Sequence, residues 1–161
     1  MSTPDNFPDQ IPALLEEIGS VLHGTNGGSD PVDRLVEYLF TEIPRYTWVG
    51  VYILEEQILV LGPYRGKPSP HTRIPLNQGI CGAAASTGET VIVPDVNADP
   101  RYLACSLETR SEIVVPIFDA EDKVLGEIDI DSDLPDAFSE LDQRFLEEVA
   151  ELLAPVLAAR R

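Results

Sequence analysis

The sequence contains little cysteine, and this shortage narrows the kind of protein it can be. Cys81 and Cys105 are the two cysteines among 161 residues. A small secreted fold stapled by disulfides needs a larger set, so we expect free thiols, or one pair that cycles between thiols and a disulfide. The start of the chain shows no basic segment followed by an apolar one. This predicts that there is no signal peptide and that the protein is cytoplasmic.

Basic residues are also scarce. The chain has 11 Lys and Arg against 28 Asp and Glu, which gives a formal net charge of −17. A field of that sign repels phosphate backbones and anionic membrane surfaces. No apolar run reaches the roughly 18 residues that can cross a bilayer. We therefore expect neither a nucleic-acid partner nor a membrane partner.

The residues that are present suit one globular domain. Hydrophobic residues make up 43% of the chain and charged residues 24%, and this length is sufficient for a buried core. The polar, proline-containing residues 1–10 predict a flexible N-terminal arm, and residues 11–161 a single domain. Residues with helical periodicity or with a β-rich composition then alternate along the chain. The expected helices are 11–22, 31–43, 81–87 and 139–156, and the expected strands are 47–54, 58–64, 90–93, 112–118 and 123–132.

Three local signals refine the helix ends. Asp30 followed by Pro31 is typical of an N-cap and a first helical residue. Ser139 predicts the N-cap of the last helix, and Pro155 is expected to kink or end it. Helices at both ends and a largely antiparallel sheet between them indicate the α+β class, with one layer of helices on one sheet face.

The other sheet face has only two long loops to cover it, residues 65–72 and 94–107. Long loops in a compact domain are usually functional. We therefore place the functional site on this loop-covered face.

An acidic strand supports that placement. Strand alternation puts Glu127, Asp129 and Asp131 on one face and Ile128 and Ile130 on the other. One interpretation is a solvated strand face. The other is a concentrated negative field that holds the ammonium group of a ligand and raises the pKa of one carboxyl until it donates a proton.

The two thiols have different surroundings. Cys105 lies between Arg101 and Arg110, cations that favour a thiolate, although a small buried core residue is the alternative. Cys81 stands in a Gly-Ile-Cys-Gly segment, where close packing is the alternative to a chemical role. A metal site built from His71 and the two cysteines matches no standard ligand spacing, so we predict no metal.

A series of short motifs between about residues 45 and 153 resembles the free methionine-(R)-sulfoxide reductases, a branch of the GAF domain fold. The motifs occur in the order WVGVY (48–52), LGPY (61–64), TRIP (72–75), GICGAA (79–84), VPDV (93–96), AC (104–105), RSEIVVP (110–116), LG (125–126) and DIDS (129–132). Together they are far more specific than the GAF fold alone, which many small-molecule sensors share.

The resemblance implies a six-stranded antiparallel sheet, a buried pocket for one free amino acid, and a homodimer. It implies reduction of free L-methionine (R)-S-oxide to methionine through a cysteine sulfenic acid, with recycling by a thioredoxin-type reductant and no metal or organic cofactor. The implied site has a nucleophile, substrate-binding and proton-donating carboxylates, and an aromatic pocket wall. These are Cys105; Glu112, Asp129 and Asp131; and Trp48 and Tyr52. Glu127 is an acid that the family pattern does not require.

One departure concerns recycling. The family typically has a resolving cysteine ten residues before the cysteine of Gly-Ile-Cys-Gly, and here that position is His71. Three alternatives follow from this. Cys81 replaces the missing thiol, an external thiol does so, or the protein is a GAF module that binds a small molecule or senses redox state without catalysis.

Overall fold

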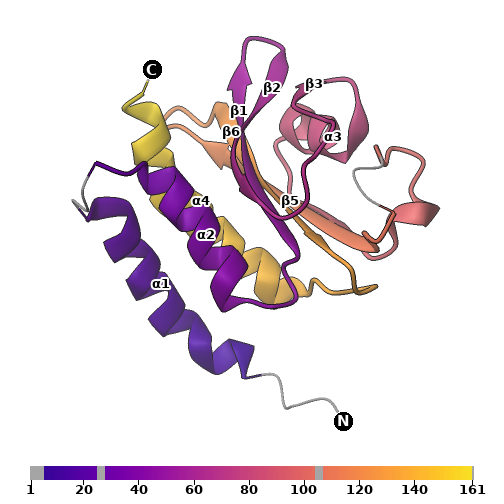
Figure 1. Ribbon diagram of the computed structural model, residues 1–161. Helices are drawn as coiled ribbons and strands as arrows, with labels where there is room; N and C mark the ends of the chain where they lie inside the picture. The colour runs from indigo at the N-terminus through magenta and orange to yellow at the C-terminus, as the bar shows by residue number, and fades with distance from the viewer. Residues whose placement is uncertain (1–5, 25–27, 104–106, 161) are drawn as a thin grey trace.

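A six-stranded sheet forms the centre of the molecule (Figure 1). The computed structural model describes residues 6–24, 28–103 and 107–160. Within them the strand order is β3-β2-β1-β6-β5-β4, and every neighbouring pair is antiparallel. This confirms the predicted α+β class and the six-stranded antiparallel sheet. The strands are β1 (Trp48–Glu55), β2 (Ile58–Arg65), β3 (Arg73–Pro75), β4 (Val91–Val93), β5 (Ser111–Phe118) and β6 (Val124–Ser132).

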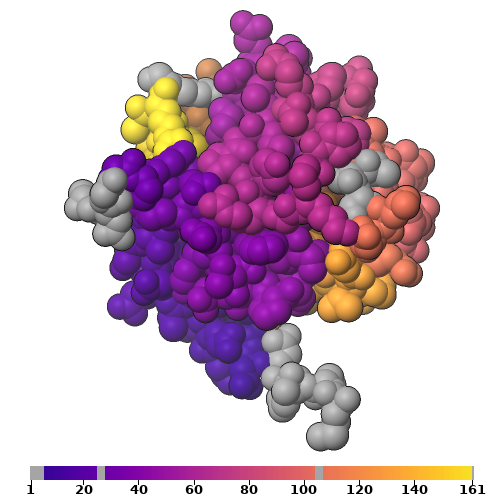
Figure 2. All heavy atoms as spheres, viewed as in Figure 1, coloured from indigo at the N-terminus to yellow at the C-terminus, as the bar shows by residue number. Residues whose placement is uncertain are grey.

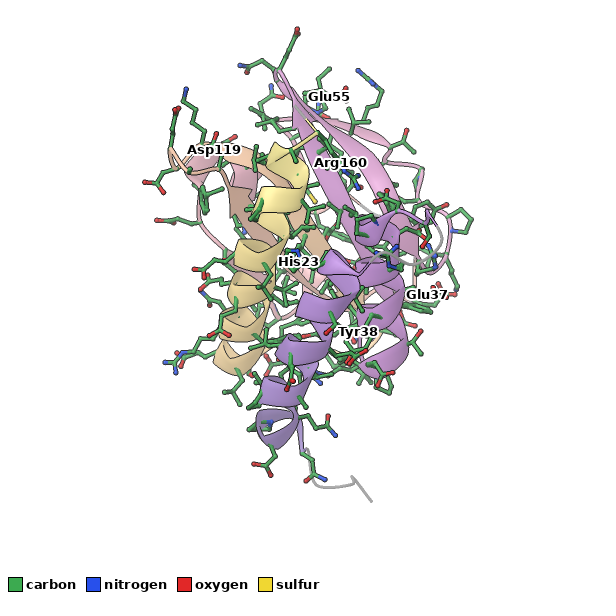
Figure 3. All side chains as sticks on the ribbon, turned by 90° about the vertical axis from the view of Figure 1, so that its left-hand side faces the viewer. His23, Glu37, Tyr38, Glu55, Asp119 and Arg160 are labelled. Atoms are coloured by element: carbon green, nitrogen blue, oxygen red, sulfur yellow. The ribbon has the colours of Figure 1, made fainter. Side chains whose placement is uncertain are left out.

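Three long helices cover one face of this sheet, as predicted. They are α1 (Phe7–His23), α2 (Pro31–Glu42) and α4 (Glu140–Ala158). The helices α2 and α4 lie on the strands, and α1 packs against both of them. Figure 3 shows the three helices in front of the sheet, with the hairpin turns at Glu55 and Asp119 at the same end. None of the helices in the described part of the chain is long and apolar enough to cross a membrane.

The first helix begins earlier than predicted. Residues 7–10 form the first turn of α1, so the predicted arm of residues 1–10 is wrong at its C-terminal end. Phe7 is 4% exposed, and its ring meets that of Phe145 in α4 edge to face, with 5.5 Å between ring centroids. This contact holds the first turn on the core. The polar residues around Phe7 in the sequence gave no sign of it. Residues 1–5 lie outside the described residues.

The predicted helix caps are confirmed, but the predicted effect of Pro155 on length is not. The Asp30 carboxylate accepts a hydrogen bond from the Val32 amide at 2.9 Å, directly before α2. Ser139 caps α4. That helix continues past Pro155 to Ala158, so the expectation that proline ends it is wrong. Leu157 in the last turn is 4% exposed, and its burial keeps this turn on the core.

The opposite sheet face is covered by a helix as well as by loops. The short helix α3 (Gly79–Thr87) contacts β3, β5 and β6, so the expectation that loops alone cover this face is wrong. Its small residues permit this close packing. A Cβ atom on Gly82 would lie 2.8 Å from the Leu76 carbonyl oxygen, closer than real Cβ contacts. In the space-filling view, β2 and the segment that follows it cover the middle of the molecule (Figure 2).

A buried carboxylate ties the chain before β1 to the start of α4. Asp142 is 1% exposed and accepts hydrogen bonds from the Tyr46 hydroxyl at 2.5 Å, the Ser139 amide at 2.9 Å and the Arg45 guanidinium. Its charge is therefore compensated by donors from two distant parts of the chain. Such a carboxylate is costly to neutralise because its donors would be left unpaired.

We predict that Asp142→Asn lowers the free energy of unfolding by about 3 kcal/mol, because an amide supplies one acceptor and turns two donors toward existing donors. Urea denaturation monitored by circular dichroism measures this change. The control is Glu140→Gln, which removes one charge from the same helical turn at an exposed position and should cost less than about 1 kcal/mol. Equal effects of the two substitutions would contradict the assigned role of Asp142.

Candidate functional site

The acidic face of β6 is buried rather than solvated. Ile128 and Ile130 join the core beneath the helices, so the alternating acids point to the opposite face, toward α3. Glu127 is 0% exposed, and Asp129 and Asp131 are each 2% exposed. The predicted alternation is confirmed, and the interpretation of a solvated strand face is wrong.

The neighbouring strand adds a fourth carboxyl to this face. Glu112 of β5 stands directly opposite Asp131 of β6, and Val114 stands opposite Asp129. Glu112 is 5% exposed. The antiparallel register therefore gathers four acids, separated by up to 19 residues in the sequence (Glu112 to Asp131), on one buried patch.

Cys81 contacts this patch from the helix above it. The thiol of Cys81 donates a hydrogen bond to Oδ2 of Asp129, with 3.3 Å between the two atoms. One donor atom from each of Cys81, Glu112 and Asp129 lies within 4.8 Å of the others. The cysteine is 5% exposed, as the packing interpretation predicted, but its thiol is also bound to a carboxyl.

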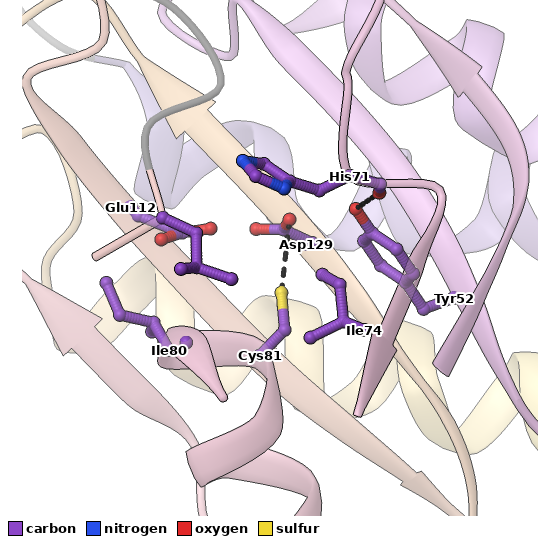
Figure 4. Close-up of a pocket in the computed structure, with 9 residues that line it drawn as sticks. Tyr52, His71, Ile74, Ile80, Cys81, Glu112 and Asp129 are labelled. Carbon is purple, nitrogen blue, oxygen red and sulfur yellow. Dashed lines mark hydrogen bonds between the residues drawn. The ribbon is translucent and has the colours of Figure 1, made fainter. Parts of the chain in front are cut away.

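A cavity opens beside this cluster (Figure 4). Counting the space at its mouth, it measures about 260 Å³. Figure 4 shows the Cys81 sulfur directed at Asp129, with His71 on the far side of the carboxyl group. The described residues that line the cavity are Tyr52, His71, Ile74, Gly79, Ile80, Cys81, Leu103, Glu112 and Asp129.

Of the predicted site residues, five line the cavity and three do not appear in its described lining. The five are Tyr52, His71, Cys81, Glu112 and Asp129. Asp131 stands opposite Glu112 on the neighbouring strand and is not among the described lining residues. Cys105 lies outside the described residues, two positions after Leu103, which lines the cavity. Sequence reasoning did not single out the other four lining residues, which are Ile74, Gly79, Ile80 and Leu103, although the first three fall within the TRIP and GICGAA motifs.

The two predicted aromatic residues hold the loop that passes over the cavity. The Tyr52 hydroxyl donates to the His71 carbonyl oxygen at 2.7 Å. The Trp48 indole N–H donates to the Lys67 carbonyl oxygen at 2.9 Å, and its ring stacks on Tyr64 with centroids 5.7 Å apart. Trp48 is therefore an anchor for the loop of residues 66–72, and it is not among the described residues of the cavity wall.

The acids shift one another toward their protonated forms. Burial raises the pKa of Glu112 well above its ordinary 4.5, and the charges of Asp129 and Asp131 raise it further. Burial, followed by the charge of Asp129, likewise raises the pKa values of Glu127 and Asp131 well above their ordinary range. Burial also raises the pKa of Asp129. The patch therefore holds carboxyl protons that isolated acids would have lost, and it offers proton donors to the cavity.

The thiol of Cys81 is affected in the same direction. Burial raises its pKa well above 9.0, and the charges of Asp129, Glu127 and Glu112 add to the shift. At neutral pH this thiol is protonated, and a protonated thiol is a weak nucleophile. The Arg101 charge that was predicted to favour a thiolate at Cys105 is already engaged, because its guanidinium donates to the Asp99 carboxylate at 2.7 Å.

Several acceptors of the patch lack a partner outside the cluster. In the described part of the chain, no donor from outside the cluster reaches the carboxyl oxygens of Glu127, Oδ1 of Asp129 or Oδ1 of Asp131, so these acids share only the protons of Cys81 and of the patch itself. No lysine or arginine among the described residues forms an ion pair with any of the four acids. Buried acceptors without partners are costly, so the arrangement suits a ligand that carries positive charge or hydrogen-bond donors.

Comparison with known proteins places this chain in a family. The model of the GAF domain matches residues 31–157. The free methionine-R-sulfoxide reductase of Saccharomyces cerevisiae is 49% identical over 109 residues, which are 66% of this chain and 60% of that protein. The enzyme of the same name from Escherichia coli is 34% identical over 120 residues, 74% of this chain and 72% of that protein.

The fold of one solved structure superposes on this chain along nearly its whole length. The free methionine-R-sulfoxide reductase of Neisseria meningitidis, in complex with its substrate, superposes with a TM-score of 0.88 at 34% identity, covering 99% of this chain and 94% of that one. The family model spans β1 to β6 and three of the four α-helices, and α1 precedes it. The chain therefore belongs to the GAF domain family, in the branch of the free methionine-R-sulfoxide reductases.

Proposed function

We propose that this protein reduces free L-methionine (R)-S-oxide to methionine, as its named relatives do. The observation that carries the proposal is the buried acid patch that opens on a small cavity and has no lysine or arginine as an ion-pair partner among the described residues. A free amino acid brings the ammonium group that such a patch lacks. The sequence and structural similarity to reductases of this substrate supports the same choice.

The cavity offers different surroundings to the two ends of the substrate: acids for its charged end and an apolar wall for its side chain. We assign the ammonium group to Glu112, Asp129 and Asp131. The first two line the cavity, and Asp131 stands opposite Glu112 on the neighbouring strand. Tyr52 and Ile74 supply an apolar wall for the methylene groups. Trp48 shapes the pocket through the Lys67 carbonyl that its indole holds.

The chemical step is assigned to Cys105. Its thiolate attacks the sulfoxide sulfur, and a carboxyl of the patch protonates the oxygen. The S–O bond of the substrate breaks, an S–O bond forms on Cys105, and methionine leaves. Methionine sulfur gains two electrons and Cys105 loses two, becoming a sulfenic acid. The raised pKa of Glu112 supports its role as the proton donor.

Cys81 suits the second step better than the first. Its buried, protonated thiol is a poor initial nucleophile, but it lies at the cavity and is the remaining cysteine of the chain. We assign it to condensation with the Cys105 sulfenic acid, which forms a disulfide and releases water. A thioredoxin-type dithiol then reduces this disulfide by exchange and becomes oxidised itself. The proposal includes a cytoplasmic homodimer whose reaction needs neither a metal nor an organic cofactor, as the resemblance implies.

A second candidate function rests on His71. This residue stands where the family has its resolving cysteine, and it lines the cavity. A GAF module that binds a small molecule or senses redox state would keep the cavity without needing that thiol. Turnover measurements separate the two functions.

The purified protein should reduce free methionine-R-sulfoxide and leave both the S epimer and peptide-bound sulfoxide unchanged. A peptide nitrogen is neutral, so it cannot replace the ammonium group at the acid patch. Methionine release with dithiothreitol, and separately with thioredoxin, measures this selectivity. Comparable rates on an oxidised peptide would rule out the ammonium pocket, and binding without turnover would favour the sensor function.

Cys105→Ser should abolish methionine release even in a single turnover, whereas Cys81→Ser should preserve that first release and lose thioredoxin-dependent cycling. A serine hydroxyl is a much weaker nucleophile than a thiolate at neutral pH. Rapid quench of stoichiometric enzyme and substrate measures the first step. If Cys81→Ser is inactive in a single turnover and Cys105→Ser is active, the two roles are reversed.

His71→Cys should raise the thioredoxin-dependent rate while the single-turnover rate stays near that of the unmodified protein. A thiol on the cavity wall acts at high effective concentration, so it competes well with external reductants. Mass spectrometry after one turnover should detect a disulfide between the new thiol and Cys105. His71→Ser is the matched control, since it changes the same position without adding a thiol. An oxidised Cys105 without that disulfide would show that the loop keeps position 71 out of reach.

A further inference from the structure

The same patch has the composition of a metal site. The sulfur of Cys81 and one carboxyl oxygen each of Glu112 and Asp129 lie within 4.8 Å of one another, and all three residues are buried. In a tetrahedral zinc site, ligand atoms 2.0–2.3 Å from the ion stand roughly 3.3–3.8 Å apart. The 3.3 Å between the Cys81 sulfur and Oδ2 of Asp129 already lies at this spacing.

Unpaired acceptors point to a cation at this place. In the described part of the chain, Oδ1 of Asp129 has no donor from outside the cluster, although Asp129 is 98% buried, with 2% of its surface exposed. The two carboxyl oxygens of Glu127, which precedes Asp129 by two residues on the same face of β6, also have no donor from outside the cluster. A bound ion would supply the positive charge that no described lysine or arginine provides.

The donor types indicate which ion. Magnesium and calcium require an all-oxygen shell, whereas a thiolate with carboxylates, and with imidazole nearby, suits zinc or cobalt. His71 lines the same cavity and lies beyond the Asp129 carboxyl from Cys81 (Figure 4). Its presence in place of the family's cysteine gives this chain a nitrogen donor at the open side of the cluster.

We propose that the reduced protein binds one Zn²⁺ ion through Cys81, Glu112 and Asp129, with His71 on the open side, and that this ion excludes the substrate. On binding, the Cys81 thiol and the protonated carboxyls of the cluster release their protons to water, and the sulfur coordinates the metal as a thiolate beside the carboxylates of Glu112 and Asp129. The exclusion of substrate rests on the proposed function, because the ion would occupy the carboxyls assigned to the ammonium group. The metal site itself does not depend on that function.

Cobalt reports this site directly, without an activity assay. Co²⁺ added to the protein, kept reduced by a phosphine in the absence of oxygen, should produce a sulfur-to-cobalt charge-transfer band that saturates at one ion per chain. Zn²⁺ should remove the band, and Mg²⁺ should not. Cys81→Ser should abolish the band, and Cys105→Ser should keep it.

Two carboxyl variants test the oxygen ligands. Asp129→Asn should weaken cobalt binding by roughly tenfold or more. Asp122→Asn is the matched control for non-specific binding to an acidic protein, because Asp122 is exposed and its φ of 62° is also accessible to Asn. This control should bind like the unmodified chain. Glu112→Gln takes the place of Asp129→Asn if circular dichroism shows that the latter is unfolded.

Three results would overturn the site: no charge-transfer band, a band that survives Cys81→Ser, or a band that disappears only with Cys105→Ser. The inhibition has its own measurement. Zn²⁺ should lower single-turnover methionine release, and excess substrate or a chelator should restore it. A cobalt band combined with zinc-insensitive release would leave the metal site standing and overturn the exclusion of substrate. If the protein releases no methionine at all, the proposed function fails, while the cobalt bands still decide the metal site.

Discussion

Mutual repulsion among buried carboxyls is the physical constraint on which the candidate site depends. Glu112, Glu127, Asp129 and Asp131 share one buried patch, and no described lysine or arginine pairs with them. Burial and the neighbouring negative charges both raise the pKa values of these acids, so carboxyl groups of the patch remain protonated. It binds best whatever delivers positive charge into the cavity. The proposed substrate ammonium group and the proposed metal ion would both satisfy this requirement, and for that reason we expect them to compete.

The contrast with Asp142 shows that the missing partners belong to the site. Asp142 is as deeply buried as the acids of the patch, yet it accepts hydrogen bonds from Tyr46, Ser139 and Arg45. The fold therefore supplies donors where a carboxylate serves structure. On the opposite sheet face it leaves acceptors open beside a cavity. Buried polar groups without partners in a native structure call for an explanation, and a ligand provides one.

The surroundings of the patch are held from two directions. Small residues let α3 approach the sheet closely enough for the Cys81 thiol to reach Asp129. From β1, Trp48 and Tyr52 bind the backbone carbonyls of Lys67 and His71. These contacts fix the loop over the cavity by its backbone, so its side chains can differ. The change from the family's cysteine to His71 is compatible with the same loop geometry for that reason.

Local rules were sufficient for much of this protein. Alternation along residues 127–131 predicted which side chains share a face, because strand period is set by backbone geometry alone. Asp30 and Ser139 predicted helix starts, because a cap forms within a few residues. The short motifs indicated the reductase branch, and these motifs together with the position of the family's resolving cysteine indicated five of the residues that line the cavity.

Tertiary structure decided what depends on contacts between distant segments. Phe7 starts a helix because Phe145 receives its ring, and the last turn of α4 persists beyond Pro155 because Leu157 is buried. No local sequence pattern predicts that α3 covers the acid patch. The same holds for the pairing of Glu112 with Asp131 and for the hydrogen bond from Cys81 to Asp129. The sequence by itself determined the acids and the direction in which they point. Their burial, their raised pKa values and their contact with a thiol arise only when strands and helix pack together, because desolvation and Coulomb repulsion depend on what surrounds a charge.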